Sequence, residues 1–171
     1  RYDTKEGQEL ERELANDLRN CIIPDDELLK NLGLFLTPGA LGRIMFIQFL
    51  YDKILNKQGV IAEFGCRYGQ NLNLFMALRG IHEPYNRLRK IIGFDTFSGF
   101  VETDEKDNDN KKGDYAVPKS YEDFLESSLS KLESFSPLSH LKKFEVVKGD
   151  ASKTVPSYIE KNPHTIFSLC Y

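Results

Sequence analysis

The chain has no tryptophan, and methionine, histidine and cysteine are all scarce among its 171 residues. Its three cysteines are far apart in the sequence, at Cys21, Cys66 and Cys170. An odd number at such spacing excludes a disulfide framework and the usual pattern of a zinc site. The three histidines also lack metal-ligand spacing. Because reduced thiols are typical of the cytoplasm, we expect a cytoplasmic protein.

Long apolar runs and an excess of positive charge are missing as well. No stretch approaches the ~20 apolar residues that a membrane-spanning helix needs, and the most apolar one, Leu41–Ile54, is interrupted by charged and polar residues. Lys and Arg total 23 against 26 Asp and Glu, a net charge of −3. This balance gives no broad attraction for anionic polymers or surfaces. We therefore expect neither nucleic acid nor a membrane as a partner.

Helical patterns fill the first third of the chain. A leucine recurs at every fourth position and predicts a helix over residues 5–20, and "DDELLKNL" predicts a second, shorter helix. In a third helix, Thr37 can cap the amino terminus, Pro38 takes the first position and Gly59 gives a stop. We therefore predict an N-terminal helical segment over residues 1–58.

After this segment, predicted strands alternate with predicted helices. The strands are Val60–Phe64, Lys90–Asp95, Phe144–Asp150 and His164–Tyr171, and the helices are Asn71–Arg79, Tyr121–Phe135 and Ser152–Lys161. Such alternation is typical of right-handed crossovers and a parallel sheet with helices on both faces. We predict an α/β domain over residues 59–171 with a Rossmann-like three-layer sandwich. The chain stops inside its fourth strand, so we expect this domain to be incomplete at its C-terminus.

The stretch "VIAEFGCRYGQN" joins the first strand to its helix through an acid and two glycines. Gly65 lets the backbone turn close to a ligand, and Gly69 lets the helix begin without a Cβ clash. Glu63 would repel a pyrophosphate but suits a cationic amino or sulfonium group. The pattern therefore favours a ligand with a positive charge at this strand end.

Two more strands end in an acid. Asp95 follows "KIIGF", where a carboxylate can accept hydrogen bonds from the two hydroxyls of a ribose. Asp150 follows the third strand, where a carboxylate can take the exocyclic amine of an adenine. Because parallel strand ends meet at one edge of a sheet, the three acids together predict a nucleoside that carries an amino acid, namely S-adenosylmethionine.

The sequence resembles the class I S-adenosylmethionine-dependent methyltransferases, and within them the macrocin O-methyltransferase family, which methylates sugar hydroxyls. The resemblance covers roughly residues 38–171 and is carried by "PGALGRIMFIQFLYDKIL", "GVIAEFGCRYGQN", "EPYN", "RKIIGFDTFSGF" and "KGDASKTVPSYI". It implies an O-methyltransferase that acts on a sugar hydroxyl of a glycan, a nucleotide-sugar or a glycosylated natural product. The expected partner is thus a small-molecule or carbohydrate acceptor.

The resemblance also assigns cofactor-binding roles to single residues. Glu63 and Gly65 would hold the methionine end, and Arg43 resembles a family position near the cofactor carboxylate. Asp95 would take the ribose, Thr96 and Phe97 would lie beside the adenosine, and Asp150 and Ala151 would meet the adenine. The rest of the predicted set is Phe64, Tyr68, Gly69, Asn71 and Gly149.

The resemblance further implies a magnesium ion bound by acids that follow the fourth strand. We therefore expect the metal ligands and the catalytic base after Tyr171, and we assign neither within this chain. A homo-oligomer is left open, because Phe35, Phe46 and Phe49 look exposed and could be buried against a second subunit.

Two other functions remain open at this stage. An NAD-dependent sugar-nucleotide enzyme shares the acid at Asp95 but needs a tighter glycine fingerprint than Gly65 and Gly69 provide. A noncatalytic nucleoside-binding protein of the same fold is the other alternative, because a fold does not fix a function.

Overall fold

The computed structural model of the protein describes residues 4–100 and 111–171. The chain divides into two compact units, Arg1–Met45 and Phe46–Tyr171. Helix α3 (Pro38–Asp52) crosses this division. Its second half belongs to the α/β unit because Ile47 and Tyr51 are fully buried in that unit's core. The sequence predicted the boundary between the two parts at residue 58, because it does not show which residues of this helix are buried. That boundary stays a prediction.

The first unit consists of short helical segments with local caps. Helix α1 (Lys5–Arg19) begins after Thr4, whose hydroxyl accepts a hydrogen bond from the Gly7 amide at 3.1 Å. The predicted short helix is divided into α2 (Asp25–Leu28) and the 3₁₀ helix η1 (Leu29–Phe35). The predicted cap of α3 is confirmed, because the Thr37 hydroxyl accepts from the Ala40 amide at 3.2 Å.

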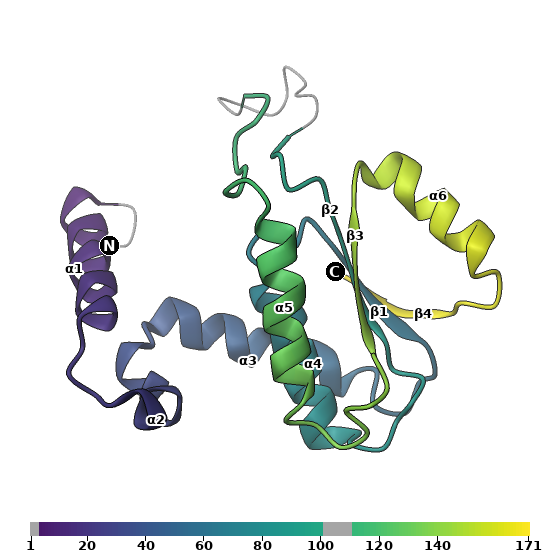
Figure 1. The fold of residues 1–171 in the computed structure, drawn as a ribbon, viewed down its shortest axis with the longest axis horizontal. Helices are drawn as coiled ribbons and strands as arrows, with labels where there is room; N and C mark the ends of the chain where they lie inside the picture. Colours follow the sequence, from purple (N-terminus) through teal and green to yellow (C-terminus); the bar gives the residue numbers. More distant parts are fainter. Residues whose placement is uncertain (1–3, 101–110) are drawn as a thin grey trace. The chain divides into compact units, whose positions relative to one another are not determined.

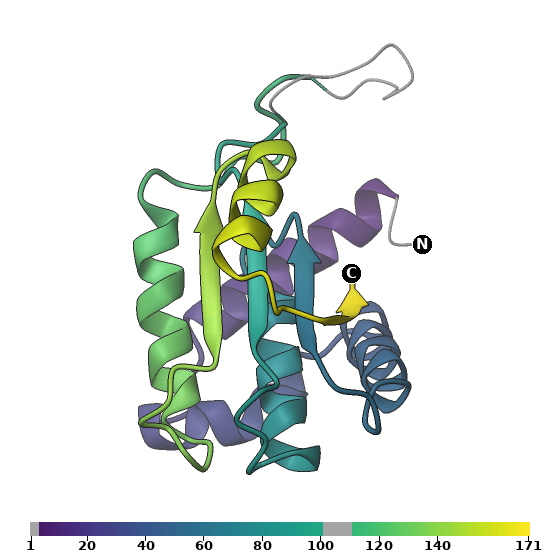
Figure 2. The ribbon, with the colours of Figure 1, turned by 90° about the vertical axis from the view of Figure 1, so that its right-hand side faces the viewer.

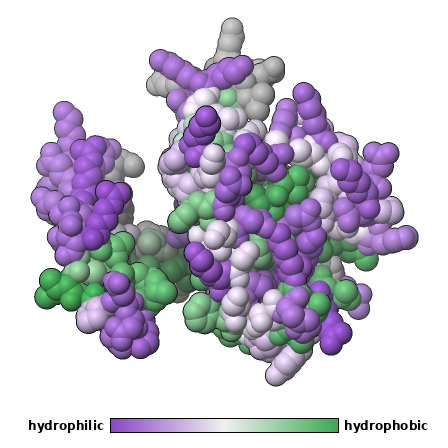
Figure 3. Space-filling view, viewed as in Figure 1, coloured by the Kyte–Doolittle hydropathy of each residue, from purple (hydrophilic) through white to green (hydrophobic). Residues whose placement is uncertain are grey.

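Apolar side chains are exposed around α2 and η1. Figure 3 shows hydrophobic residues gathered over this segment, whereas α1 is hydrophilic. The exposed leucines of the segment and its flank are Leu29, Leu32, Leu34 and Leu36. Phe46 and Phe49 are exposed as expected, but Phe35 is partly buried. Burial of these residues against a second subunit stays a prediction.

The described residues contain no single helix long and apolar enough to cross a membrane. The pair Asp25–Phe35 and Pro38–Asp52 passes this test together by length and composition alone, with a bend of 93° between its two parts.

The second unit contains a four-stranded parallel sheet, as predicted. The strand order is β3-β2-β1-β4, which Figure 2 shows from left to right. The strands are β1 (Val60–Phe64), β2 (Ile91–Asp95), β3 (Phe144–Lys148) and β4 (Phe167–Cys170). Because every strand runs in the same direction, their carboxyl ends lie along one edge of the sheet.

Helices cover both faces of this sheet. They are α4 (Gln70–His82), α5 (Tyr121–Glu133) and α6 (Ala151–Lys161). Figure 1 shows α4 and α5 on one side and α6 on the other. Residues alternate along each strand, so Ile61 and Ile91 pack into the core beneath α4 and α5, whereas Ala62 and Ile92 pack with Tyr158 of α6. The three-layer α/β architecture predicted from the sequence is thereby confirmed.

Two arginines are buried at the opposite, amino-terminal edge of the sheet. The Arg79 side chain pairs with Glu133, which also pairs with Lys143. The Arg89 side chain pairs with Glu83 and is 1% exposed. Charges buried this deeply are tolerated because they are paired and hydrogen-bonded. These clusters fix the end of the domain that lies away from the predicted ligand site.

Candidate functional site

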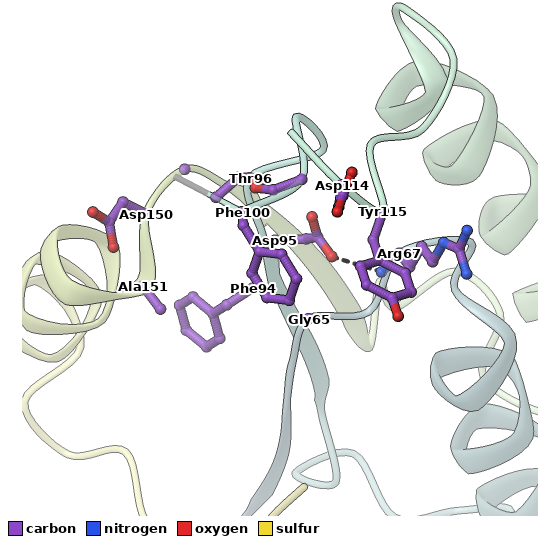
Figure 4. Close-up of a pocket in the computed structure, with 12 residues that line it drawn as sticks. Gly65, Arg67, Phe94, Asp95, Thr96, Phe100, Asp114, Tyr115, Asp150 and Ala151 are labelled. Atoms are coloured by element: carbon purple, nitrogen blue, oxygen red, sulfur yellow. Dashed lines mark hydrogen bonds between the residues drawn. The ribbon is translucent and has the colours of Figure 1, made fainter. Parts of the chain in front are cut away.

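A cavity of about 480 Å³ lies at the carboxyl ends of β1, β2 and β3. Its size is within the ~300–1,000 Å³ typical of small-molecule sites. Figure 4 shows its lining residues, which come from the turns after these three strands and from the loop that precedes α5. They are Gly65, Arg67, Phe94, Asp95, Thr96, Gly99, Phe100, Asp114, Tyr115, Gly149, Asp150 and Ala151.

The turn between β1 and α4 is built on two left-handed glycines. Gly65 has a φ of +79° and open space where a Cβ would be, so its backbone faces the cavity without a side chain. Gly69 has a φ of +75° and lies immediately before α4. A Cβ on Gly69 would lie 2.3 Å from Cδ1 of Leu125 in α5. Gly65 thus gives access to the cavity, whereas Gly69 permits close packing behind it.

Asp95 joins the ends of β1 and β2 through its carboxylate. One oxygen, Oδ2, accepts the backbone amide of Arg67, and the other, Oδ1, accepts the amide of Phe97, each at 2.6 Å. A carboxylate has about four lone-pair sites, so each oxygen can still accept another donor. The residue therefore holds the turn in place and also presents acceptors to the cavity. Its predicted bond to a ribose is compatible with this geometry and stays a prediction.

Glu63 lies beneath the turn and does not line the cavity. Its side chain points to the α4 face, as strand alternation requires, and is 2% exposed. Its Oε1 accepts the side-chain amide of Asn71 at 2.9 Å. Asn71 is itself buried at the start of α4. These two predicted residues form a buried support for the glycine turn, and the predicted contact of Glu63 with a methionine end stays a prediction.

One side of the cavity is apolar and lies against α6. Phe94 points to the α6 face of the sheet, where its ring stacks on that of Phe64 at a centroid distance of 5.3 Å. Ala151 begins α6, and Asp150 caps this helix by accepting the Ser152 amide at 2.9 Å. The hydrogen bonds from Ser152 lower the pKa of Asp150, which keeps its carboxylate charged. This side offers an apolar surface with an acid at its rim, as adenine recognition would need.

The Phe97 side chain does not line the cavity, and its predicted place beside the adenosine stays a prediction. Its side chain is 6% exposed and packs into the core beneath α4 and α5, because the left-handed φ of +57° turns it away from the cavity. Phe94 and Phe100 line the cavity instead. Alternation along β2 could have indicated Phe94, because a residue next to Asp95 must lie on the opposite face of the sheet.

The described residues on the two sides of positions 101–110 pair with each other. The Phe100 amide donates to the Asp114 carbonyl at 3.1 Å, and the Gly113 amide donates to the Phe100 carbonyl at 3.0 Å. This pairing places Asp114 and Tyr115 in the lining. The predicted charged loop Glu102–Asp114 lies for the most part outside the described residues, at positions 101–110.

Aromatic rings and one arginine border this part of the cavity. The Phe100 and Tyr115 rings make an edge-to-face contact at 5.5 Å. The Arg67 guanidinium lies over the rings of Tyr68 and Tyr115, with its Cζ 4.8 Å and 5.1 Å from their centroids. Tyr68 is exposed and does not line the cavity itself. Arg67 lies inside the glycine motif but was not predicted as a site residue, because the motif indicates a role only for its acid and its glycines.

Cys66 is the buried residue of the same turn. Its side chain is 4% exposed. Burial raises the pKa of the Cys66 thiol, and the nearby carboxylates of Asp95 and Glu63 raise it further. The thiol is therefore a neutral packing group and not a nucleophile.

The predicted site residues fall into three groups. The structure brings together Gly65, Asp95, Thr96, Gly149, Asp150 and Ala151 in the lining of the cavity. Around or beneath the lining lie Glu63, Phe64, Tyr68, Gly69, Asn71 and Phe97. Arg43 is an exposed residue of α3 within the first compact unit, so its predicted role rests on the sequence alone.

Residues 4–100 and 111–171 contain no cluster of three or more His, Cys, Asp or Glu side chains that could hold a metal ion. The acids of the cavity do not form such a cluster, and their oxygens accept backbone amides. These residues therefore do not fit a magnesium site.

The chain is similar to two solved structures of methyltransferases. One is a crystal structure of CalS11, calicheamicin methyltransferase, with 39% identity and a TM-score of 0.94. The match covers 99% of this chain and 67% of that one. The other is an apo structure of CalS11, TDP-rhamnose 3'-O-methyltransferase, an enzyme in calicheamicin biosynthesis. It has 37% identity and a TM-score of 0.85, and the match covers 99% of this chain and 66% of that one.

The chain thus spans about two thirds of the length of both matched chains. Neither a protein-family model nor a curated protein matches the sequence.

Proposed function

Because the chain belongs to the sugar O-methyltransferase family represented by CalS11, we propose that the protein methylates a sugar hydroxyl and uses S-adenosylmethionine as methyl donor. The observation that carries this proposal is the match to CalS11, with 39% identity over 99% of the chain and a TM-score of 0.94. Similarity of this kind extends through the turns that form the cavity, because it covers nearly every residue of the chain.

The cavity residues fit the parts of S-adenosylmethionine in order along the sheet edge. Gly65 exposes backbone where the methionine end would pass. The Asp95 carboxylate has lone pairs left for the ribose diol after it accepts two backbone amides. Phe100 and Ala151 offer apolar surface to an adenine, and Asp150 lies where a carboxylate can accept a hydrogen bond from its exocyclic amine.

In this proposal the residues of the chain act by binding and orienting. When bound, S-adenosylmethionine supplies a methyl group on a sulfonium, whose carbon–sulfur bond breaks as the bond to the acceptor oxygen forms. The acceptor hydroxyl gives its proton to water in the same reaction, and S-adenosylhomocysteine would leave as the neutral thioether. Holding two reactants in line is worth up to ~7–11 kcal/mol of the barrier. We assign no catalytic base among the described residues, because Asp95, Asp114 and Asp150 each already accept at least one backbone amide.

As acceptor we propose a sugar linked to a nucleotide. The support for this class is the match to CalS11, which acts on TDP-rhamnose. TDP-rhamnose is accordingly the first acceptor to test with the purified protein and S-adenosylmethionine. Mass spectrometry should show a product heavier than the acceptor by one methylene unit.

Binding of S-adenosylhomocysteine tests the cavity without any need for turnover. We expect wild-type protein to bind it in calorimetry and Asp95→Asn to weaken binding by about tenfold or more, since a charged acceptor is lost. Asp123→Asn, an exposed acid in the first turn of α5, is the matched control. Melting temperatures should be recorded for each variant, because Asp95 also holds the turn.

Unchanged affinity in Asp95→Asn would remove this residue from the site. Wild-type protein that binds NADH and not S-adenosylhomocysteine would favour the dinucleotide-enzyme alternative.

A further inference from the structure

Arg67 is held in a fixed position at the rim of the cavity. Its backbone amide donates to the Asp95 carboxylate at 2.6 Å. Its guanidinium lies over the rings of Tyr68 and Tyr115, 4.8 Å and 5.1 Å from their centroids. A guanidinium that stacks on aromatic faces keeps the N–H groups of its edge available for hydrogen bonds. The side chain is therefore positioned before any ligand binds.

The Arg67 guanidinium has no hydrogen-bond or ion-pair partner in the part of the chain that the structure describes. Among the described residues that line the cavity, Arg67 is also the one cation, and the other charged residues are Asp95, Asp114 and Asp150. Each of these acids accepts at least one backbone amide, from Arg67 and Phe97, Lys111 and Ser152 respectively. None of them uses the guanidinium as its partner.

The charges of the cavity are therefore arranged unevenly. Figure 4 shows Arg67 and Asp150 on opposite sides of the cavity. A ligand with both cationic and anionic groups would place its anionic group near Arg67, because the acids repel it elsewhere. Carboxylate and phosphate both match the planar fork of a guanidinium.

We infer that Arg67 pairs with an anionic group, a carboxylate or a phosphate, of a ligand bound in this cavity. The inference rests on the proposed function, which supplies two sources of that group. One is the carboxylate of the methionine end of S-adenosylmethionine, and the other is the diphosphate of a nucleotide-linked acceptor.

The test compares wild-type protein with Arg67→Gln and Arg67→Lys in calorimetric titrations. Glutamine keeps a long side chain and the backbone amide that Asp95 accepts. It also faces the same left-handed φ of 46° as arginine, so strain is matched. Lysine keeps the charge but not the fork. Arg87→Gln is the control, because Arg87 is exposed and precedes β2 at the opposite edge of the sheet.

Three probes separate the two sources of the anion. S-adenosylhomocysteine has a carboxylate, 5'-methylthioadenosine has the same nucleoside without it, and TDP has a diphosphate. If Arg67 binds the carboxylate, Arg67→Gln should lose about tenfold or more for S-adenosylhomocysteine and less than about twofold for methylthioadenosine. If it binds the phosphate, the loss should fall on TDP alone. Arg67→Lys should recover part of either loss.

Equal weakening of all three probes would overturn the inference, since it would indicate a structural role for Arg67. Wild-type affinities for S-adenosylhomocysteine and TDP that Arg67→Gln leaves unchanged would overturn it as well, while the proposed function would stand. Wild-type protein that binds neither ligand would contradict the proposed function and the inference together.

Discussion

Arg89 joins three segments of the chain at the amino-terminal edge of the sheet, and its replacement by methionine should destabilise the α/β unit. Its side chain is 1% exposed and contacts both oxygens of Glu83, at 2.9 and 3.1 Å. It also donates to the backbone carbonyls of Ile54, Lys57 and Gly59 and to the hydroxyl of Ser168, at 2.6–2.9 Å. Methionine fills similar space but donates none of these hydrogen bonds.

The size of the effect follows from what Arg89→Met leaves behind. Glu83 is 12% exposed and would lose its only cation among the described residues, although Tyr51 and Asn86 would still donate to it. Removing one partner of a buried pair costs about 3–5 kcal/mol. Proteins of this size lose roughly 2–4 °C of melting temperature per kcal/mol, so we expect a decrease of roughly 6–20 °C.

Urea denaturation and thermal melting measure this loss directly. Arg87→Met, two residues away and exposed, is the matched control and should change stability by less than about 0.5 kcal/mol. Where Arg89→Met remains folded, it should bind S-adenosylhomocysteine within about twofold of wild type, because the cavity lies at the other edge of the sheet. A stability loss below about 1 kcal/mol would refute the reasoning that this buried pair fixes the fold.

Two further predictions concern the glycine turn and the buried acid. Gly69→Ala should lower the free energy of unfolding by about 1–3 kcal/mol through overpacking against Leu125, and by a further ~1–2 kcal/mol through backbone strain. Gly65→Ala should lower it by the strain alone, because open space lies where its Cβ would be. Equal losses for the two variants in urea denaturation would contradict this prediction. Burial raises the pKa of Glu83, but hydrogen bonds from Arg89, Tyr51 and Asn86 outweigh it, so the pKa lies below its ordinary 4.5. The stability that the charged Glu83 contributes should therefore be fully present above pH 4.5 and be lost as pH falls through the lower folded-state pKa. Denaturation curves recorded between about pH 6 and about pH 3 measure this dependence, and Glu83→Gln should make it weaker.

The sheet was predictable from the sequence because each strand is a short apolar run with clear ends. The limits of β1 agree with the prediction, Val60–Phe64, since glycines lie on both sides of it. The end of α3 was not predictable in the same way. The sequence indicated a helix up to Gly59, but α3 ends at Asp52, and tighter turns follow. The carbonyls of Ile54 and Lys57 in those turns bind Arg89, a partner more than thirty residues away.

The site was predictable where it depends on strand ends and not where it depends on loops. Asp95 and Asp150 could be placed together because parallel strands bring their ends to one edge. Asp114 and Tyr115 line the cavity because Phe100 pairs with Gly113 and Asp114. No local pattern in the sequence indicates this pairing. The orientation of the Phe97 side chain depends on the left-handed backbone of Phe97 itself, and no glycine or asparagine at that position indicates this conformation in the sequence.

The buried thiol of Cys66 gives the glycine turn a built-in reporter. Reagents that modify thiols need an accessible thiolate, and Cys66 offers neither exposure nor a low pKa in the folded turn. Cys170 is exposed and Cys21 is partly exposed, so both should react first. The slower labelling of Cys66 would then measure how often the turn between β1 and α4 opens. A ligand that stabilises the closed turn should slow the labelling of this cysteine further.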